Sequence, residues 1–285
     1  MLIAVSGSTG FIGKELCNHL INSGHEIVAV RQKDLVLPIH EFKEILRETD
    51  IFINLAGAPV LKRWTRSYKR KLYSSRIIIV DKVLTAMRLL KDRPRLFISA
   101  SAIGIYDYIN IHTEESKEFA GNFLSELVVG WEKEIMKASD LNNLRVVIFR
   151  FGIVLGNSGG AFPSMKLPFR FLLGGRIGSG KQYFSFVHIE DVLRAIMFMI
   201  QHPEQQGVFN LVAPEVTTYR QFAKILGKVM HRPSFMVLPS FLIKLRFGKA
   251  SSLLLNGQNV KPMRLTEAGF EFKFKNIEVA LLSLV

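Results

Sequence analysis

Residues 2–13 read L-I-A-V-S-G-S-T-G-F-I-G, an apolar run that leads directly into three spaced glycines. This pattern predicts a strand, a tight turn and a helix, followed by a second strand over residues 26–30. Gly7 permits the turn, Gly10 lets the backbone approach a pyrophosphate, and Gly13 lets the helix pack on the sheet. The free N–H groups and positive dipole end of the helix then favour phosphate groups. The stretch therefore predicts the start of a dinucleotide-binding α/β domain.

The residues after the second strand distinguish between two nicotinamide cofactors. An Asp or Glu there would accept hydrogen bonds from the ribose hydroxyls of NAD. This chain has Arg31, with Lys33 close by, and Asp34 comes a few residues later. Because a guanidinium pairs well with a 2′-phosphate, NADP(H) is favoured over NAD(H).

Further apolar strands follow at 50–57, 96–102 and 145–156, separated by stretches with helical spacing. Strands that alternate with helices indicate an α/β fold with a Rossmann-type, doubly wound parallel sheet. The 50–57 strand ends in small residues, and Ala56 and Gly57 would let a cofactor lie against the backbone. In the short connection before it, residues 35–37 are a candidate strand.

The character of the sequence changes after residue 156. We expect an NADP-binding domain over residues 1–156, to which 184–212 returns, and a smaller mixed α/β lobe over 157–285 that binds substrate. Residues 174–182 resemble a phosphate-binding P-loop, but Gln182 replaces the hydroxyl that would hold magnesium, so we reject that interpretation. The candidate contacts for an anionic substrate in this lobe are Arg170, Arg176, Lys181 and Gln182, and simple surface solvation explains them equally well.

The net charge is +14, and residues 62–76 hold seven basic side chains without an acid. Three interpretations of this basic stretch remain open: a solvated helix face, a surface for cofactor phosphates, and a nucleic-acid surface. No nucleic-acid motif accompanies the stretch. The single cysteine, Cys17, has the surroundings of a buried thiol, and no histidine spacing indicates a metal site. No signal peptide and no apolar run of about 18 residues is present, so we expect a cytoplasmic protein without membrane contact.

Together these motifs resemble the extended short-chain dehydrogenase/reductase superfamily, the NAD(P)-dependent epimerase/dehydratase group. The match is closer to an atypical branch of it, often labelled as nucleoside-diphosphate-sugar epimerases. The stretches that carry the resemblance run from end to end: Asn54–Gly57, Ser99–Ser101 with Tyr106, Arg63-Trp64, Trp131-Glu132, His188–Asp191, His231–Pro233 and Glu267–Phe270. The branch tends to bind NADP, and its substrate is not settled.

The resemblance implies a set of cofactor contacts in this chain. They are Gly7, Ser8, Thr9, Gly10, Phe11, Ile12, Gly13, Arg31, Leu55, Ala56, Gly57, Arg76 and Val154. Val154 would lie on the nicotinamide side. For Arg76 the physical reason is a cation near the phosphates, and a solvated helix residue is the alternative.

The wider superfamily uses a tyrosine and a lysine four residues apart, and this chain has Phe123 and Leu127 there. Neither can transfer a proton, and no Tyr-x-x-x-Lys occurs anywhere in the chain. Two candidates remain for catalysis. Tyr106 could reach the nicotinamide pocket, or it could only pack. Ser101 could hydrogen-bond a carbonyl oxygen, or it could only cap its strand.

Two functions are therefore open. The first is an NADP(H)-dependent oxidoreductase or epimerase-like enzyme acting on a small, anionic or nucleotide-linked molecule. The second is a non-catalytic NADP(H)-binding protein that reports redox state to a partner. The missing tyrosine and lysine favour the second, whereas Ser101, Tyr106 and the polar loop 174–185 favour the first. The oligomeric state is open, with a homodimer as the candidate.

Overall fold

The computed structural model describes residues 1–285 and is built on one six-stranded sheet. All its strand pairs are parallel, in the order β10-β6-β4-β3-β1-β2. The strands are β1 (Leu2–Ser6), β2 (Glu26–Val30), β3 (Ile51–Asn54), β4 (Leu96–Ala102), β6 (Arg145–Phe151) and β10 (Gly207–Leu211). The chain order reverses between β1 and β3, which is where open parallel sheets bind ligands.

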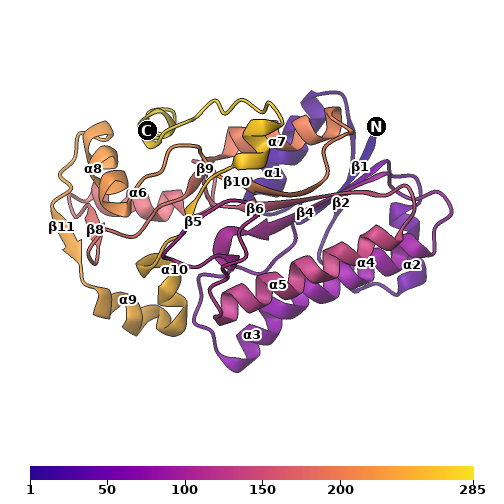
Figure 1. Cartoon of the computed structure of the whole chain (residues 1–285), viewed down its shortest axis with the longest axis horizontal. Helices are drawn as coiled ribbons and strands as arrows, with labels where there is room; N and C mark the ends of the chain where they lie inside the picture. The colour runs from indigo at the N-terminus through magenta and orange to yellow at the C-terminus, as the bar shows by residue number, and fades with distance from the viewer.

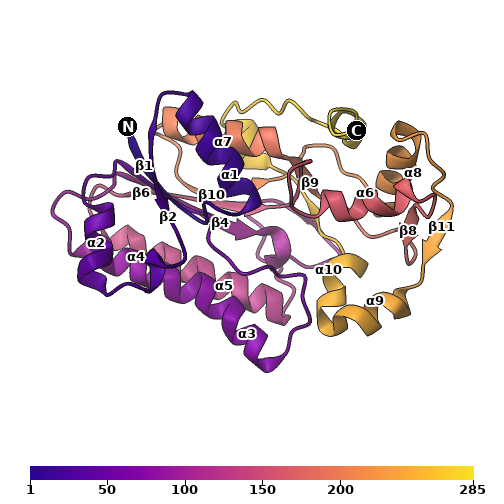
Figure 2. The ribbon, with the colours of Figure 1, turned by 180° about the vertical axis from the view of Figure 1, so that it is seen from behind.

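Helices cover both faces of this sheet, as buried parallel strands require (Figures 1 and 2). One face packs against α1 (Phe11–Asn22) and α7 (Ile189–Gln201) through an apolar cluster that contains Leu16 and Ile196. The helices on the other face are α2 (Ile39–Leu46), α4 (Ile79–Arg88) and α5 (Phe123–Met136), with α3 (Arg66–Tyr73) leading into α4. This arrangement confirms the predicted doubly wound α/β fold.

Segments of the second half of the chain that do not join the main sheet form a smaller mixed lobe at the left of Figure 1. It has its own apolar core, which includes Phe162, Phe222 and Leu281. Its elements are α6 (Phe162–Arg170), β8 (Gly175–Ile177), α8 (Tyr219–Val229), β11 (Met236–Leu238), α9 (Ser240–Phe247), α10 (Ser252–Leu255) and α12 (Ile277–Leu282). The remaining short elements are β5 (Ile111–His112), β7 (Ile153–Leu155), β9 (Phe186–His188), β12 (Asn259–Val260) and α11 (Met263–Glu267).

Two local predictions meet different outcomes. The candidate strand at residues 35–37 is wrong, because Asp34–Val36 forms a 3₁₀ turn. The Asp34 carboxylate accepts the Arg31 backbone N–H at 2.7 Å, which closes the turn and leaves β2 at the edge of the sheet. The P-loop interpretation was rightly rejected, since Gly175–Ile177 is a strand paired with β11 and no helix follows it.

Two polar side chains, His188 and Asp191, fix the start of α7. The buried Asp191 carboxylate accepts the backbone N–H groups of Lys273 at 2.8 Å and Phe274 at 2.9 Å. His188 Nδ1 instead caps the helix by accepting the N–H of Glu190. Asp191 is thus an anchor between α7 and the C-terminal segment.

Candidate functional site

The glycines of the first turn have different steric surroundings. Gly7 has a φ of +74°, and a Cβ there would lie 2.7 Å from the carbonyl oxygen of Leu55. A Cβ on Gly13 would lie 2.1 Å from the Gly7 oxygen, so both positions need glycine for the fold itself. Gly10 is exposed, and its nearest neighbour, the Gly7 oxygen, would be 3.2 Å away. Gly10 therefore leaves open space in front of the helix.

The start of α1 is suited to an anion. No side chain caps this helix, and its first turn contains no acidic residue. Its first N–H groups and its dipole therefore favour a negative group from outside the helix. The hydroxyl of Ser8 lies buried in the same turn without a hydrogen-bond partner. A buried polar atom of this kind is satisfied when a ligand oxygen accepts its proton.

Arg31 lies beside this turn. Ser6 pairs with Val30, so the residue after β2 stands at the same sheet end as Gly7. The Arg31 side chain is exposed and its guanidinium makes no hydrogen bond or ion pair, since only the backbone groups of Arg31 are hydrogen-bonded, to Asp34 and Leu35. The guanidinium is therefore free to pair with an anionic group beyond β2.

Arg76 is a cation without a carboxylate partner. It lies in a π-helical turn, Ser74–Ile78, a distortion that is frequent at functional sites. Its guanidinium donates to the Ala58 oxygen at 3.0 Å and lies 5.3 Å from the centre of the Trp131 ring. Burial lowers the pKa of Arg76 to about 10, so it stays charged at neutral pH. A half-buried positive charge without a counterion favours an anionic ligand.

A cavity of about 530 Å³ opens at the carboxyl ends of the strands, between the sheet and the lobe. Five of the predicted cofactor residues line it: Phe11, Ile12, Gly57, Arg76 and Val154. The other predicted contacts are not part of its wall: Gly7, Ser8, Thr9, Gly10, Gly13, Arg31, Leu55 and Ala56. The turn before α1, Gly7–Gly10, which we call the phosphate turn, leads directly into the cavity wall at Phe11.

The structure places the hydroxyls of both Ser101 and Tyr106 in a buried hydrogen-bond network. Ser101 donates to Glu132 at 2.6 Å, and Glu132 also pairs with the Arg150 guanidinium, at 2.6 and 2.8 Å. Arg150 donates to the Tyr106 hydroxyl at 2.6 Å, and that hydroxyl lies 2.9 Å from Asn210 Oδ1. Neither Ser101 nor Tyr106 lines the cavity. The geometry thus favours a structural role for both.

The positions of the missing tyrosine and lysine are filled by packing side chains. The Phe123 ring meets Trp64 edge to face with the ring centres 5.2 Å apart. Leu127 is buried in the core between α4 and α5. Lys69 Nζ also lies 4.2 Å from the centre of the Phe123 ring, so this helix offers packing contacts but no proton-transferring group at these two positions.

Tyr219 is a candidate that the sequence reasoning missed. It is 7% exposed and lines the cavity, yet its hydroxyl makes no hydrogen bond within the protein. Burial raises the pKa of Tyr219 to about 12, so the hydroxyl remains protonated and can donate. The sequence held one signal: Thr218 and Gln221 form a capping box, which fixes Tyr219 as the first residue of α8.

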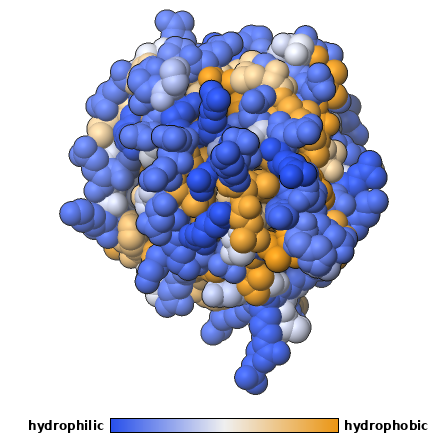
Figure 3. Space-filling model, turned by 90° about the vertical axis from the view of Figure 1, so that its right-hand side faces the viewer, coloured by the Kyte–Doolittle hydropathy of each residue, from blue (hydrophilic) through white to orange (hydrophobic).

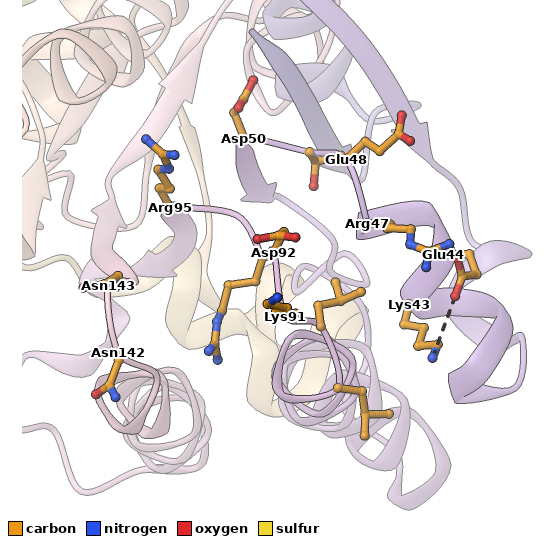
Figure 4. Close-up of a pocket in the computed structure, with 14 residues that line it drawn as sticks. Lys43, Glu44, Arg47, Glu48, Asp50, Lys91, Asp92, Arg95, Asn142 and Asn143 are labelled. Carbon is orange, nitrogen blue, oxygen red and sulfur yellow. Dashed lines mark hydrogen bonds and ion pairs between the residues drawn. The ribbon is translucent and has the colours of Figure 1, made fainter.

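A second hollow, of about 910 Å³, lies at the opposite, amino ends of the strands. Figure 4 shows Asp50, Arg95 and Asn143 on the segments that enter β3, β4 and β6. Charges of both signs line it, such as Lys43 and Glu44 at 3.8 Å. Figure 3 faces this end of the molecule, where hydrophilic residues cover most of the surface. Parallel sheets bind ligands at the other end, so we do not assign this hollow a ligand.

None of the helices combines the length and the hydropathy that crossing a bilayer requires. No group of three or more His, Cys, Asp or Glu side chains is placed to hold a metal ion.

Comparison with known proteins gives consistent matches. The NAD dependent epimerase/dehydratase family model matches residues 3–211, and a domain of unknown function, DUF1731, matches residues 238–284. An epimerase family protein of Staphylococcus saprophyticus is 38% identical, and the alignment covers 99% of this chain and 98% of that protein. A relative from Staphylococcus haemolyticus is 35% identical with the same coverage.

Two solved structures extend the comparison to three dimensions. Human epimerase family protein SDR39U1 (isoform 2), solved with NADPH, has a TM-score of 0.90 at 30% identity, covering 100% of this chain and 99% of that one. The nucleoside-diphosphate sugar epimerase of Corynebacterium glutamicum has a TM-score of 0.80 at 27% identity, covering 99% of this chain and 57% of that one.

Proposed function

Because this chain belongs to the NAD dependent epimerase/dehydratase family, we propose that it is an NADP(H)-dependent oxidoreductase. The turn before α1 would hold the pyrophosphate of the cofactor, and the cavity of about 530 Å³ would receive its nicotinamide end. The lobe over residues 157–285 binds the substrate. The single observation that carries the proposal is the phosphate turn: Ser8 has a buried hydroxyl without a partner, and Gly10 leaves space in front of an uncapped helix.

Two cations account for the preference for NADP(H). The free Arg31 guanidinium beyond β2 pairs with the 2′-phosphate, which NAD(H) lacks. Arg76 lies deeper in the site, where its unpaired charge attracts another anionic group of the cofactor or of the substrate. The solved human relative, whose structure holds NADPH, supports this choice.

The bound cofactor supplies or accepts a hydride, and the protein positions the substrate and manages the proton. In the reductive direction a bound NADPH would supply the hydride for a substrate carbonyl carbon, and the electron pair of the C=O π bond would move to the oxygen, which then needs a proton. The Tyr219 hydroxyl, protonated at neutral pH, donates its proton to that oxygen and regains one from water. The mainly apolar wall of the cavity keeps other water away from the reacting atoms.

A second candidate function is a non-catalytic NADP(H)-binding protein that reports redox state. The packing of Phe123 and Leu127, together with the buried Ser101 and Tyr106, favours it, because none of the four can act on a substrate. Substrate-dependent oxidation of NADPH would establish the enzyme. Binding without turnover of any carbonyl compound would leave the second function in place.

The test of the cofactor site is a calorimetric titration of NADPH into the wild type and Gly10→Val. The valine fills the phosphate approach, and its Cβ would meet only the Gly7 oxygen, at 3.2 Å, so we expect binding to be lost while the fold is retained. Gly24→Asn is the control, since Gly24 follows the end of α1 far from the turn, has nothing within 4 Å, and has a φ of +81° that asparagine tolerates. Undiminished NADPH binding by Gly10→Val would refute the proposed site.

A further inference from the structure

A cavity of about 950 Å³ in the C-terminal lobe has a predominantly hydrophobic lining. It lies between α6, β8, β11 and α9, and 14 of its 20 lining residues are hydrophobic. Met236, Val237 and Leu238 of β11 form one wall, and each is 40–44% exposed. Ile243 and Phe247 of α9 contribute another part of the wall. Concave apolar surface of this size is typical of a ligand site.

This lobe cavity continues into the cavity assigned to the nicotinamide. The two share wall residues, among them Val60, Met165, Tyr219 and Leu254. Tyr219 therefore lies at the junction of the two cavities, and no hydrogen bond within the protein engages its hydroxyl. A molecule that extends from the lobe cavity toward the nicotinamide would lie against Tyr219.

The polar groups of the lobe cavity are too few for a nucleotide sugar. Apart from Tyr219, the polar side chains in its wall are Ser164 and Arg176. Arg176 already donates to the Ser179 carbonyl at 2.9 Å. A nucleotide sugar carries two phosphates and several hydroxyls, and burying these groups without partners is unfavourable. An alkyl or prenyl chain has no such requirement and gains from every methylene buried.

We propose that the substrate is a long-chain aldehyde or ketone, or the corresponding alcohol, whose apolar chain occupies the lobe cavity and whose oxygen meets Tyr219. This proposal rests on the proposed function and names its substrate class. It replaces the anionic or nucleotide-linked substrate expected from the sequence. The continuity of the two cavities argues for a substrate chain rather than a membrane or a protein partner, neither of which would need a path to the nicotinamide.

The test uses calorimetry with stable, uncharged probes. NADP⁺ is titrated first, and hexanol, octanol and decanol are then titrated into the loaded protein, with UDP-glucose as the competing ligand class. The expected affinity rises about three- to fourfold for each added methylene. UDP-glucose is expected to bind much more weakly than decanol.

Variants locate the binding of the chain. Val237→Asp places a charge in the cavity wall and is expected to lower decanol affinity at least tenfold. Val279→Asp is the matched control, since Val279 is 43% exposed against 44% for Val237 but lies on α12, outside the cavity. Ser164→Phe, which fills the cavity from an exposed position on α6, should weaken decanol binding in the same way.

Each outcome supports or overturns the proposal. The proposal is supported if alkanol affinity rises with chain length and if Val237→Asp and Ser164→Phe reduce this rise while Val279→Asp does not. Three results would overturn it. They are equal affinity for all alkanols, tighter binding of UDP-glucose than of decanol, and vesicle binding that Val237→Asp abolishes without changing alkanol affinity. Failure to bind NADP⁺ refutes the proposed function instead, and the alkanol titrations still report on the cavity.

Discussion

Tyr106→Phe separates a structural hydroxyl from a catalytic one. The Tyr106 hydroxyl accepts from Arg150 at 2.6 Å and can donate its one proton to Asn210 or to the Thr113 carbonyl, both at 2.9 Å. Phenylalanine keeps the ring stacked on His112, at 4.7 Å, and removes one charge-assisted and one neutral hydrogen bond. Arg150 retains Glu132, so we expect a loss of about 2–3 kcal/mol of unfolding free energy. For 285 residues that corresponds to roughly 3–5 °C in the unfolding temperature.

The assay combines thermal and urea unfolding with a titration of NADPH. Tyr73→Phe is the control, because the Tyr73 side chain is 50% exposed and its hydroxyl makes no hydrogen bond, so the change should cost less than about 0.5 kcal/mol. NADPH affinity should be unchanged in both variants. If Tyr106→Phe unfolded like the wild type but lost turnover, the hydroxyl would be catalytic and the structural assignment wrong.

Three further results are expected. Gly13→Ala should lower the unfolding temperature and NADPH affinity together, because its Cβ would lie 2.1 Å from the Gly7 oxygen; a stable variant would contradict this. Burial lowers the pKa of His188, so its stabilising effect is present above its unfolded pKa of about 6.5 and is lost as the pH falls below it. In urea unfolding, His188→Asn, whose side chain can still cap α7, should flatten that acid dependence. Tyr219→Phe should lower kcat but leave NADPH affinity unchanged, and equal kcat would exclude Tyr219 as the proton donor.

The nucleotide-binding half of the fold could be predicted because its signals are local. The strand over 2–6 and the helix after it follow from hydrophobic periodicity and from glycine spacing, and both appear at the predicted positions. The apolar runs of β3, β4 and β6 likewise identify strands that are buried on both faces. Residues 35–37 were mispredicted because an Asx-type contact, from Asp34 to Arg31, competes with strand formation there.

The candidate catalytic residues could not be predicted in the same way. Tyr106 meets Asn210, which is 104 positions away, and Ser101 meets Glu132, 31 positions away. Periodicity places a residue on an element but does not reveal a distant partner for its hydroxyl. Tyr219 was missed for the same reason, since its exposure to two cavities depends on how α6, α8 and α10 come together in the lobe.

The most direct test of the central claim is a calorimetric comparison of NADPH and NADH binding in the wild type and Arg31→Ala. The account predicts that the wild type prefers NADPH, and that Arg31→Ala loses roughly tenfold or more in NADPH affinity while NADH binding stays within about twofold. Arg47→Ala, an exposed arginine at the opposite end of the sheet, should change neither. Equal losses for both cofactors in Arg31→Ala, or no binding of either by the wild type, would contradict the account.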